Sequence, residues 1–236
     1  MAPFAHAVVV GAGGLGCPAL LGLVAGGVRR ITIVDHDRVE TTNLARQVLF
    51  GPADVGFSKA ATARLALLRR APDAAIEAIE RRLAPADAAR FVEALPPDTV
   101  VLDATDDPSV KFALNDACRR RGIYLVLGAA LGTRAQVLGV GPAGACYRCI
   151  YEAPPPAGSL PTCDRAGVLS TVVGAAGFLM ATVALAGTFG TLHVFDGAAA
   201  TVRTLSPAPR RDCPACRAAR RTDAFVPSNA NLERKT

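Results

Sequence analysis

Four of the seven cysteines form two C-x-x-C pairs, Cys146 with Cys149 and Cys213 with Cys216. Thiolates at this spacing are common zinc ligands, and two pairs supply the four that a closed tetrahedral site needs. The alternatives are a chance pairing or a redox motif, but a redox motif needs one pair, beside a helix of a thioredoxin-like unit. We therefore predict a structural Zn²⁺ that joins distant parts of the chain and takes no part in catalysis.

A glycine-rich stretch, residues 8–16 (VVVGAGGLG), has the form of a strand that enters a phosphate-binding turn. Gly11, Gly13 and Gly14 would let the backbone turn tightly and bring its N–H groups close to phosphate oxygens. Asp35 follows the next predicted strand, at the spacing where a carboxylate accepts ribose hydroxyls. These features alone fit an NAD-dependent oxidoreductase as well as other nucleotide-binding proteins.

Basic and polar residues after Asp35 favour a triphosphate over a dinucleotide. The polar residues Asn43, Arg46 and Gln47 come first, and Lys59 follows as one of three lysines among 26 basic residues. Cations beside a glycine turn can neutralise the β- and γ-phosphates of ATP, which N–H groups alone cannot do. The alternative is that Arg46 and Lys59 are merely solvated, but their position after the glycine turn predicts ATP.

Acidic residues follow the most apolar predicted strand, in residues 103–107 (DATDD). Open α/β sheets bind ligands at the carboxyl ends of their strands, and a carboxylate beside phosphates can hold Mg²⁺. Asp107 could instead cap the helix expected to begin near Ser109. We predict that Asp106 binds the Mg²⁺ and that Asp107 is a further cofactor contact.

Taken together, these motifs resemble those of the ThiF/MoeB/HesA family, the ubiquitin-activating-like adenylyltransferases of sulfur-carrier pathways. The resemblance covers about residues 7–218 and rests on motifs that occur in the same order and at similar spacing. These motifs are VVVGAGGLG, IVDHD, TNLARQ, Lys59, DATD, GAA, CYRC, TCDRAGV and CPAC.

The resemblance implies adenylation of the C-terminal Gly-Gly carboxylate of a small ubiquitin-like sulfur carrier, with release of pyrophosphate. It also implies a homodimer and, for some members, a sulfur donor protein. Gly13 and Gly14 would wrap the ATP phosphates, Asp35 would hold the ribose and Asp106 the Mg²⁺. The triphosphate would be lined by Asn43, Arg46, Gln47 and Lys59.

Cys163 follows a proline-rich stretch, residues 152–161, that we expect to be a crossing loop. The resemblance implies a crossover-loop cysteine that joins the activated carrier or accepts sulfur, with Arg46, Lys59 and Asp106 as the other catalytic residues. An inert loop thiol is the alternative. Cys17 and Cys118 lie at helix positions and are expected to be small core residues. His6, His36 and His193 have no metal-like spacing and are expected to be structural or surface residues.

Two departures from the family pattern leave a second function open. Members usually begin with a helix that carries an R-Y-x-R-Q sequence, whose arginine reaches the neighbouring protomer's nucleotide, and residues 1–6 contain no arginine. Asp107 stands where an Asn is usual. Another basic group or a partner protein could replace the arginine, or the chain could be a weak or inactive relative that binds the carrier as a scaffold.

The expected elements alternate as in a doubly wound α/β fold with a mostly parallel, Rossmann-like sheet and an antiparallel C-terminal extension. Strands are predicted at residues 7–10, 30–34, 76–79, 98–103, 124–127, 135–140, 191–196 and 200–205. Helices are predicted at residues 16–26, 53–70, 85–94 and 109–121.

At 236 residues the chain fits one adenylation domain, residues 1–218, and a flexible tail at 219–236. Within it, residues 1–140 would bind the nucleotide, and residues 141–218 would carry the zinc, the crossover loop and the carrier site. The net charge of +6 is dispersed, so no nucleic-acid partner is expected. Residues 172–190 are uncharged, but their small side chains indicate a core or dimer-interface helix rather than a membrane span. No secretory signal precedes the first strand, which predicts a cytoplasmic protein.

Overall fold

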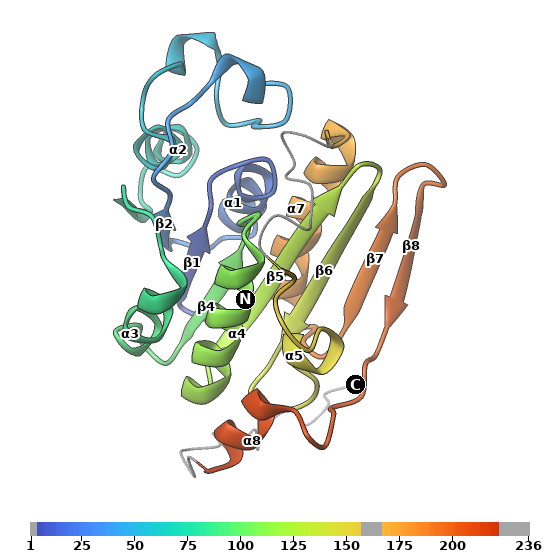
Figure 1. Cartoon of the computed structure of the whole chain (residues 1–236). Coiled ribbons are helices and arrows are strands. Elements are labelled where there is room, and N and C mark those ends of the chain that lie inside the picture. The colour runs from blue at the N-terminus through green and yellow to red at the C-terminus, as the bar shows by residue number, and fades with distance from the viewer. Residues whose placement is uncertain (1–3, 157–166, 222–236) are drawn as a thin grey trace, which may run out of the picture.

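A mixed eight-stranded sheet runs through the molecule in the order β3-β2-β1-β4-β5-β6-β7-β8 (Figure 1). The structure is a computed structural model and describes residues 4–156 and 167–221. The strands are β1 (His6–Val10), β2 (Arg30–Val34), β3 (Ala75–Ile79), β4 (Thr99–Asp103), β5 (Tyr124–Leu131), β6 (Arg134–Val140), β7 (Leu192–Asp196) and β8 (Thr201–Leu205). The predicted mostly parallel sheet with antiparallel C-terminal strands is confirmed.

The first five strands in the sheet order are parallel, and their register brings three carboxyl ends together. Val10 of β1 lies opposite Val34 of β2 on one side and Asp103 of β4 on the other. The strand order reverses direction between β1 and β4, which is the point where such sheets bind ligands. The glycine turn, Asp35 and the loop after Asp103 therefore begin side by side.

Helices cover both faces of the sheet, as expected for parallel strands that are apolar throughout. One core lies under α1, α2 and α7, and the other under α3, α4, α5 and α8 (Figure 1). The helices are α1 (Gly16–Ala25), α2 (Lys59–Leu68), α3 (Ala88–Glu93), α4 (Pro108–Arg121), α5 (Tyr147–Ile150), α7 (Ser170–Ala186) and α8 (Pro214–Arg221).

The uncharged stretch 172–190 forms most of α7, which packs on α1, β5 and β6. Small residues allow this close approach: a Cβ on Gly177 would lie 2.4 Å from the Leu15 carbonyl oxygen. The helix ends at Gly187, which has the left-handed backbone (φ +66°) that favours glycine. Over residues 4–156 and 167–221, no helix has the length and hydropathy that a membrane crossing requires.

The largest differences from the sequence-based bounds occur in two elements. The helix predicted at 53–70 begins only at Lys59, because Pro52–Asp54 form a 3₁₀ turn and Gly56 has φ +89°. Strand β5 continues beyond residue 127 to Leu131, because the hairpin with β6 pairs Leu131 with Arg134. The hairpin is a tertiary feature that the apolar pattern of residues 124–127 did not indicate.

Candidate nucleotide site and cysteine cluster

The glycine turn between β1 and α1 is shaped by close backbone approaches. Gly11 has φ +94°, and a Cβ there would lie 2.9 Å from the Ala104 carbonyl oxygen in the loop after β4. A Cβ on Gly16 would lie 1.9 Å from the Gly11 carbonyl oxygen. A Cβ on Gly13, in contrast, would meet nothing nearer than Gln47 Nε2 at 3.9 Å. Gly11 and Gly16 are thus required by the fold, whereas the space at Gly13 is free for a ligand.

Asp35 directly follows β2 and holds the glycine turn in place. Its carboxylate accepts hydrogen bonds from Ala12 N (2.6 Å) and Asp37 N (2.7 Å), and its side chain is buried. Burial raises the pKa of Asp35, while the two backbone hydrogen bonds and nearby Lys59 act in the opposite direction. Each carboxylate oxygen keeps a lone pair, so Asp35 can still accept a ribose hydroxyl.

The polar segment after β2 folds back against the glycine turn. Asn43 and Gln47 are buried, and Gln47 Oε1 has no hydrogen-bond partner among the described residues. Arg46 donates to Asn43 Oδ1, and its Cγ is 3.5 Å from the position of a Cβ on Gly14. Three of the predicted triphosphate contacts are therefore gathered beside the glycines, and one of them carries an unsatisfied buried oxygen.

Lys59 is the first residue of α2, and its side chain is buried. Its ammonium lies 3.0 Å from Asp37 Oδ2, and its backbone N–H donates to the Asp37 carbonyl oxygen at 2.9 Å. Asp37 was not singled out from the sequence, although its place two residues after Asp35 was visible. It holds the predicted catalytic lysine, and its own carboxylate is half exposed.

The two carboxylates after β4 have different surroundings. Asp107 caps α4 by accepting from Ser109 N at 2.9 Å, and its other oxygen lies 3.7 Å from Arg82. Although burial raises the pKa of Asp107, hydrogen bonds from Ser109 and Val110 and the Arg82 charge outweigh it and lower the pKa. Asp106 is exposed and makes no hydrogen bond or ion pair within the described part of the chain. Asp107 is therefore occupied as the helix cap, whereas Asp106 is free to bind a cation.

A buried ion pair that the sequence analysis missed lies beneath this loop. Asp103 is fully buried, and Lys111 Nζ approaches its Oδ1 at 3.4 Å. The sequence signal was the rarity of lysine in an arginine-rich chain.

The four paired cysteines come together beside the C-terminal half of α4, away from the Asp107 cap at its start. Their sulfur atoms lie 3.5–3.9 Å apart for the four closest pairs and within 4.8 Å of one another overall. A tetrahedral site with metal–sulfur bonds of about 2.3 Å has sulfur–sulfur edges of about 3.8 Å. The cluster, formed by the starts of α5 and α8, could therefore hold a metal ion.

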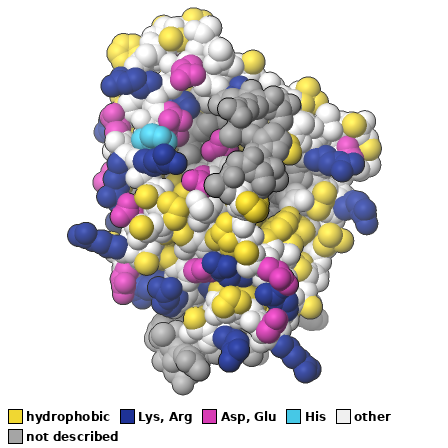
Figure 2. Space-filling view, viewed as in Figure 1, with side chains coloured by type: hydrophobic (Ala, Val, Ile, Leu, Met, Phe, Trp, Pro, Cys, Tyr) yellow, Lys and Arg dark blue, Asp and Glu magenta, His cyan; other side chains and the backbone are white. Residues whose placement is uncertain are grey.

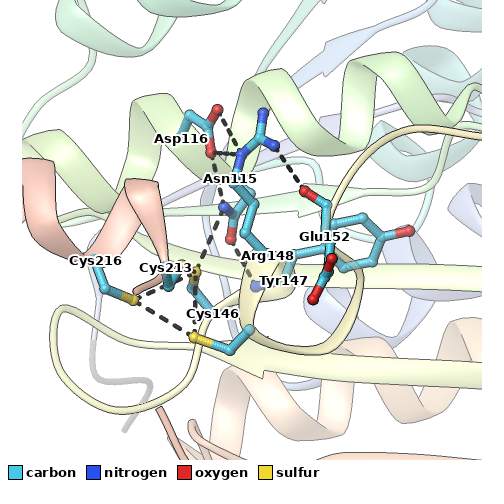
Figure 3. A network of polar contacts seen from close by, with 9 residues as sticks. Asn115, Asp116, Cys146, Tyr147, Arg148, Glu152, Cys213 and Cys216 are labelled. Atoms are coloured by element: carbon cyan, nitrogen blue, oxygen red, sulfur yellow. Dashed lines mark hydrogen bonds and ion pairs between the residues drawn. The ribbon is translucent and has the colours of Figure 1, made fainter. Parts of the chain in front are cut away.

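Side chains of α4 support this cluster (Figure 3). Asn115 donates to Cys146 Sγ at 3.7 Å and accepts from Tyr147 N at 2.8 Å. Asp116 accepts both bonds of an ion pair with Arg148 at 2.7 and 2.9 Å. One helix thus connects the cysteine cluster with the loop that carries Asp106.

The remaining cysteines and histidines lie outside the cysteine cluster, and His193 of β7 pairs with Thr204 of β8 at 3.0 Å. Cys17 and Cys118 lie in the cores, and burial raises the pKa of Cys17 to about 12. The predicted catalytic Cys163 lies outside the described residues. His6 is buried between threonine side chains, and His36 is half exposed.

Comparison with known proteins identifies the family, because residues 3–221 match the ThiF family. The chain belongs to the ThiF family. The "SAMP-activating enzyme E1" of Haloferax volcanii is 38% identical over 216 residues, which cover 89% of this chain and 79% of that protein. The "Sulfur carrier protein adenylyltransferase" of Thermus thermophilus is 40% identical over 225 residues, which cover 90% and 82%.

Among solved structures, E. coli MccB with ATP superposes with a TM-score of 0.77 at 20% identity, over 90% of this chain and 67% of MccB. At this identity the likeness shows the fold alone. The predicted membership of the ThiF family and the predicted adenylyltransferase activity are both confirmed. An oxidoreductase, the alternative that the glycine turn left open, is thereby removed.

Proposed function

We propose that this ThiF-family chain, as one adenylation domain over residues 1–218, activates the C-terminal Gly-Gly carboxylate of a ubiquitin-like sulfur carrier with ATP. The observation that carries the proposal is the arrangement at the carboxyl ends of β1, β2 and β4. Open space at Gly13, an unsatisfied oxygen on Gln47 and a free carboxylate on Asp106 all lie around one glycine turn. The name of the Thermus thermophilus relative, a sulfur carrier protein adenylyltransferase, supports the carrier as the second substrate.

In this proposal the chain binds ATP and supplies charge, without a side-chain nucleophile. Backbone N–H groups at Gly13 and Gly14 face the phosphates, and Asp35 receives the ribose. Cations and amides from the segment after β2 neutralise and orient the triphosphate, namely Asn43, Arg46, Gln47 and Lys59. An oxygen of the carrier's terminal carboxylate forms a bond to the α-phosphorus, and the bond to the bridging oxygen breaks, so that pyrophosphate leaves with that electron pair. Positioning and electrostatic stabilisation are sufficient for such a step.

Asp106 is the residue that would hold the Mg²⁺ accompanying ATP, and the ion would supply further charge neutralisation at the phosphates. Asp106 is suited to this because it is exposed and unpaired within the described residues. Asp107 could contribute only by giving up part of its contact with Ser109.

The four clustered cysteines would hold Zn²⁺, for which the sulfur spacing is appropriate. Four protein ligands fill its coordination sphere, so the ion would be structural. It would fasten α8 to α5 across 63 residues of chain.

We further propose a cytoplasmic homodimer and, at a later step, transfer of sulfur from a donor protein to the activated carrier. Cys163 is the candidate for a covalent bond to the carrier or for accepting the sulfur. Intact-mass spectrometry of the protein with ATP and carrier would show a conjugate, which is absent in Cys163→Ser if this proposal holds.

The adenylation itself is tested by pyrophosphate release from ATP, Mg²⁺ and a ubiquitin-like carrier that ends in Gly-Gly. The matched control is the same carrier without its last glycine. Release that depends on the intact terminus supports the proposal. Calorimetric binding of the carrier with no release at any Mg²⁺ concentration would overturn it and favour the carrier-binding scaffold.

A further inference from the structure

Two ionisable side chains in the described structure are deeply buried but have no part in the proposed function. Asp103, the last residue of β4, is 0% exposed, and Lys111, in α4, is 4% exposed. Lys111 Nζ lies 3.4 Å from Asp103 Oδ1 and donates a 2.7 Å hydrogen bond to the Gly128 carbonyl oxygen in β5. Because an unpaired buried charge is strongly unfavourable, each of the two residues requires the other.

Asp103 also closes the turn that leads to Asp106. Its Oδ1 accepts from Thr105 N at 2.9 Å and from Thr105 Oγ1 at 2.7 Å. On the far side of Asp106, the Asp107 cap fixes the start of α4. Asp106 itself makes no polar contact with described residues, so its place is set entirely by the backbone that Asp103 and Asp107 hold.

This loop is also in direct contact with the glycine turn. Ala104 N donates to the Val10 carbonyl oxygen at 2.8 Å, and the Ala104 carbonyl oxygen lies 2.9 Å from the position that a Cβ on Gly11 would take. A tilt of the loop would therefore move Asp106 relative to the glycine turn. Lys111 prevents such a tilt by joining α4 to β5 through Gly128.

We propose that Asp103 and Lys111 are positioning residues that orient Asp106 toward the Mg²⁺–ATP bound at the glycine turn, an inference that rests on the proposed function. Asp103 shapes the turn. The Lys111 ammonium balances the buried charge of the Asp103 carboxylate beneath the loop. Lys111 also anchors α4 to β5 through its hydrogen bond to Gly128. Asp103 Oδ2 has no partner among the described residues, which leaves Lys111 as the group that balances this carboxylate.

The test measures how the Mg²⁺ concentration for half-maximal pyrophosphate release changes in Lys111→Met. We expect an increase of about tenfold or more, as for groups that orient metal ligands. Lys111→Arg keeps the charge and should recover most of the difference. The control is Arg120→Met, which removes one positive charge from an exposed position of the same helix. An unchanged Mg²⁺ dependence in a folded Lys111→Met protein would overturn the proposal.

A second comparison separates positioning from folding. Asp103→Asn keeps an oxygen acceptor for Thr105, and combined with Lys111→Met it removes both charges together. We expect this double variant to fold and to need less Mg²⁺ than Asp103→Ala, which loses the turn. Equal Mg²⁺ dependence of the two would count against the role of Asp103.

A separate measurement distinguishes failure of the proposed adenylation from failure of the positioning role. If the wild-type protein releases no pyrophosphate with the carrier, the same variants are compared by the Mg²⁺ dependence of ATP binding in calorimetry. A shift of about tenfold there supports the positioning role on its own, and no shift overturns it.

Discussion

Asp106 and Asp107 are adjacent, but their side chains do different things, and this gives a prediction at the scale of single residues. Asp106→Ala removes no contact that the described structure shows, so its stability should stay within about 0.5 kcal/mol of wild type. Pyrophosphate release should fall by about 100-fold, because the proposed Mg²⁺ ligand is lost.

Asp107→Ala should lose stability and should keep more of the pyrophosphate release than Asp106→Ala. Loss of the cap costs about 1 kcal/mol of stability. Thermal unfolding and pyrophosphate release, measured on both variants, separate the two roles. A strongly destabilised Asp106→Ala protein would contradict the assignment.

His6 gives a pH prediction at the same scale. Burial lowers the pKa of His6, and nearby Arg30 lowers it further. The folded state therefore keeps His6 neutral below pH 6.5, where the unfolded chain takes up a proton, and the free energy of unfolding falls as the pH drops through this window.

His6→Gln has no such proton to gain. We expect its unfolding free energy, from urea titrations between about pH 7 and pH 5, to fall less steeply than that of wild type. Parallel slopes for the two proteins would show that His6 titrates normally in the folded state.

At the scale of elements, the packing of the glycine turn against α7 depends on Gly14. A Cβ at this position would lie 2.6 Å from Val173 Cγ1, so Gly14→Ala should lose about 1–3 kcal/mol of stability. Gly13→Ala meets no atom nearer than 3.9 Å and should fold normally but bind ATP more weakly. As a control, Gly174→Ala within α7 meets nothing within 4 Å and should gain up to about 1 kcal/mol. Urea unfolding and ATP calorimetry on the three variants check this order.

The cysteine cluster governs a second set of elements, α5 and α8. Removal of the bound metal by a chelator should lower Tm by about 5 °C or more, since each kcal/mol lost shifts Tm by about 2–4 °C in a chain of this size. Cys213→Ser should have a low Tm that chelator does not lower further. Cys17→Ala, a core cysteine outside the cluster, should keep one metal ion per chain. Elemental analysis that finds no zinc in the purified wild-type protein would contradict the zinc assignment.

At the scale of the whole molecule, exposed apolar side chains gather on one segment beside the nucleotide site. They are Val48, Val55, Phe57 and Leu65, between 40% and 63% exposed. Apolar side chains are visible at the top of Figure 2, over this region of the molecule. The helix considered for the dimer interface, α7, buries eight of its 17 residues within the chain, while its Phe178 is 48% exposed.

Exposed apolar surface of this kind favours association. We expect light scattering to give the mass of a dimer for the wild-type protein. Phe57→Glu should shift the mass toward one chain, whereas Val202→Glu on the edge strand β8 should not. A wild-type protein that stays monomeric at high concentration would contradict the homodimer.

The sequence by itself determined the features that are local or that recur at fixed spacing. The glycine turn, Asp35, the acidic loop and the two C-x-x-C pairs each need neighbouring residues in a set pattern, so their chemistry could be read without coordinates. The parallel core strands were equally plain, because strands buried on both faces are continuously apolar.

Only the tertiary structure decided which side chains meet. That Asp37 holds Lys59 and that Lys111 balances Asp103 both depend on distances between chain segments. The Asp107 cap is local, and the sequence offered it as an alternative, but the structure decided that Ser109 occupies Asp107 while Asp106 has no partner among the described residues. No periodicity encodes the two ion pairs, since Asp37 and Lys59 are 22 residues apart and Asp103 and Lys111 belong to different elements. For the same reason the cysteines showed a metal-binding pattern in the sequence, whereas their support by α4, which also carries the loop of the nucleotide site, became visible only in the fold (Figure 3).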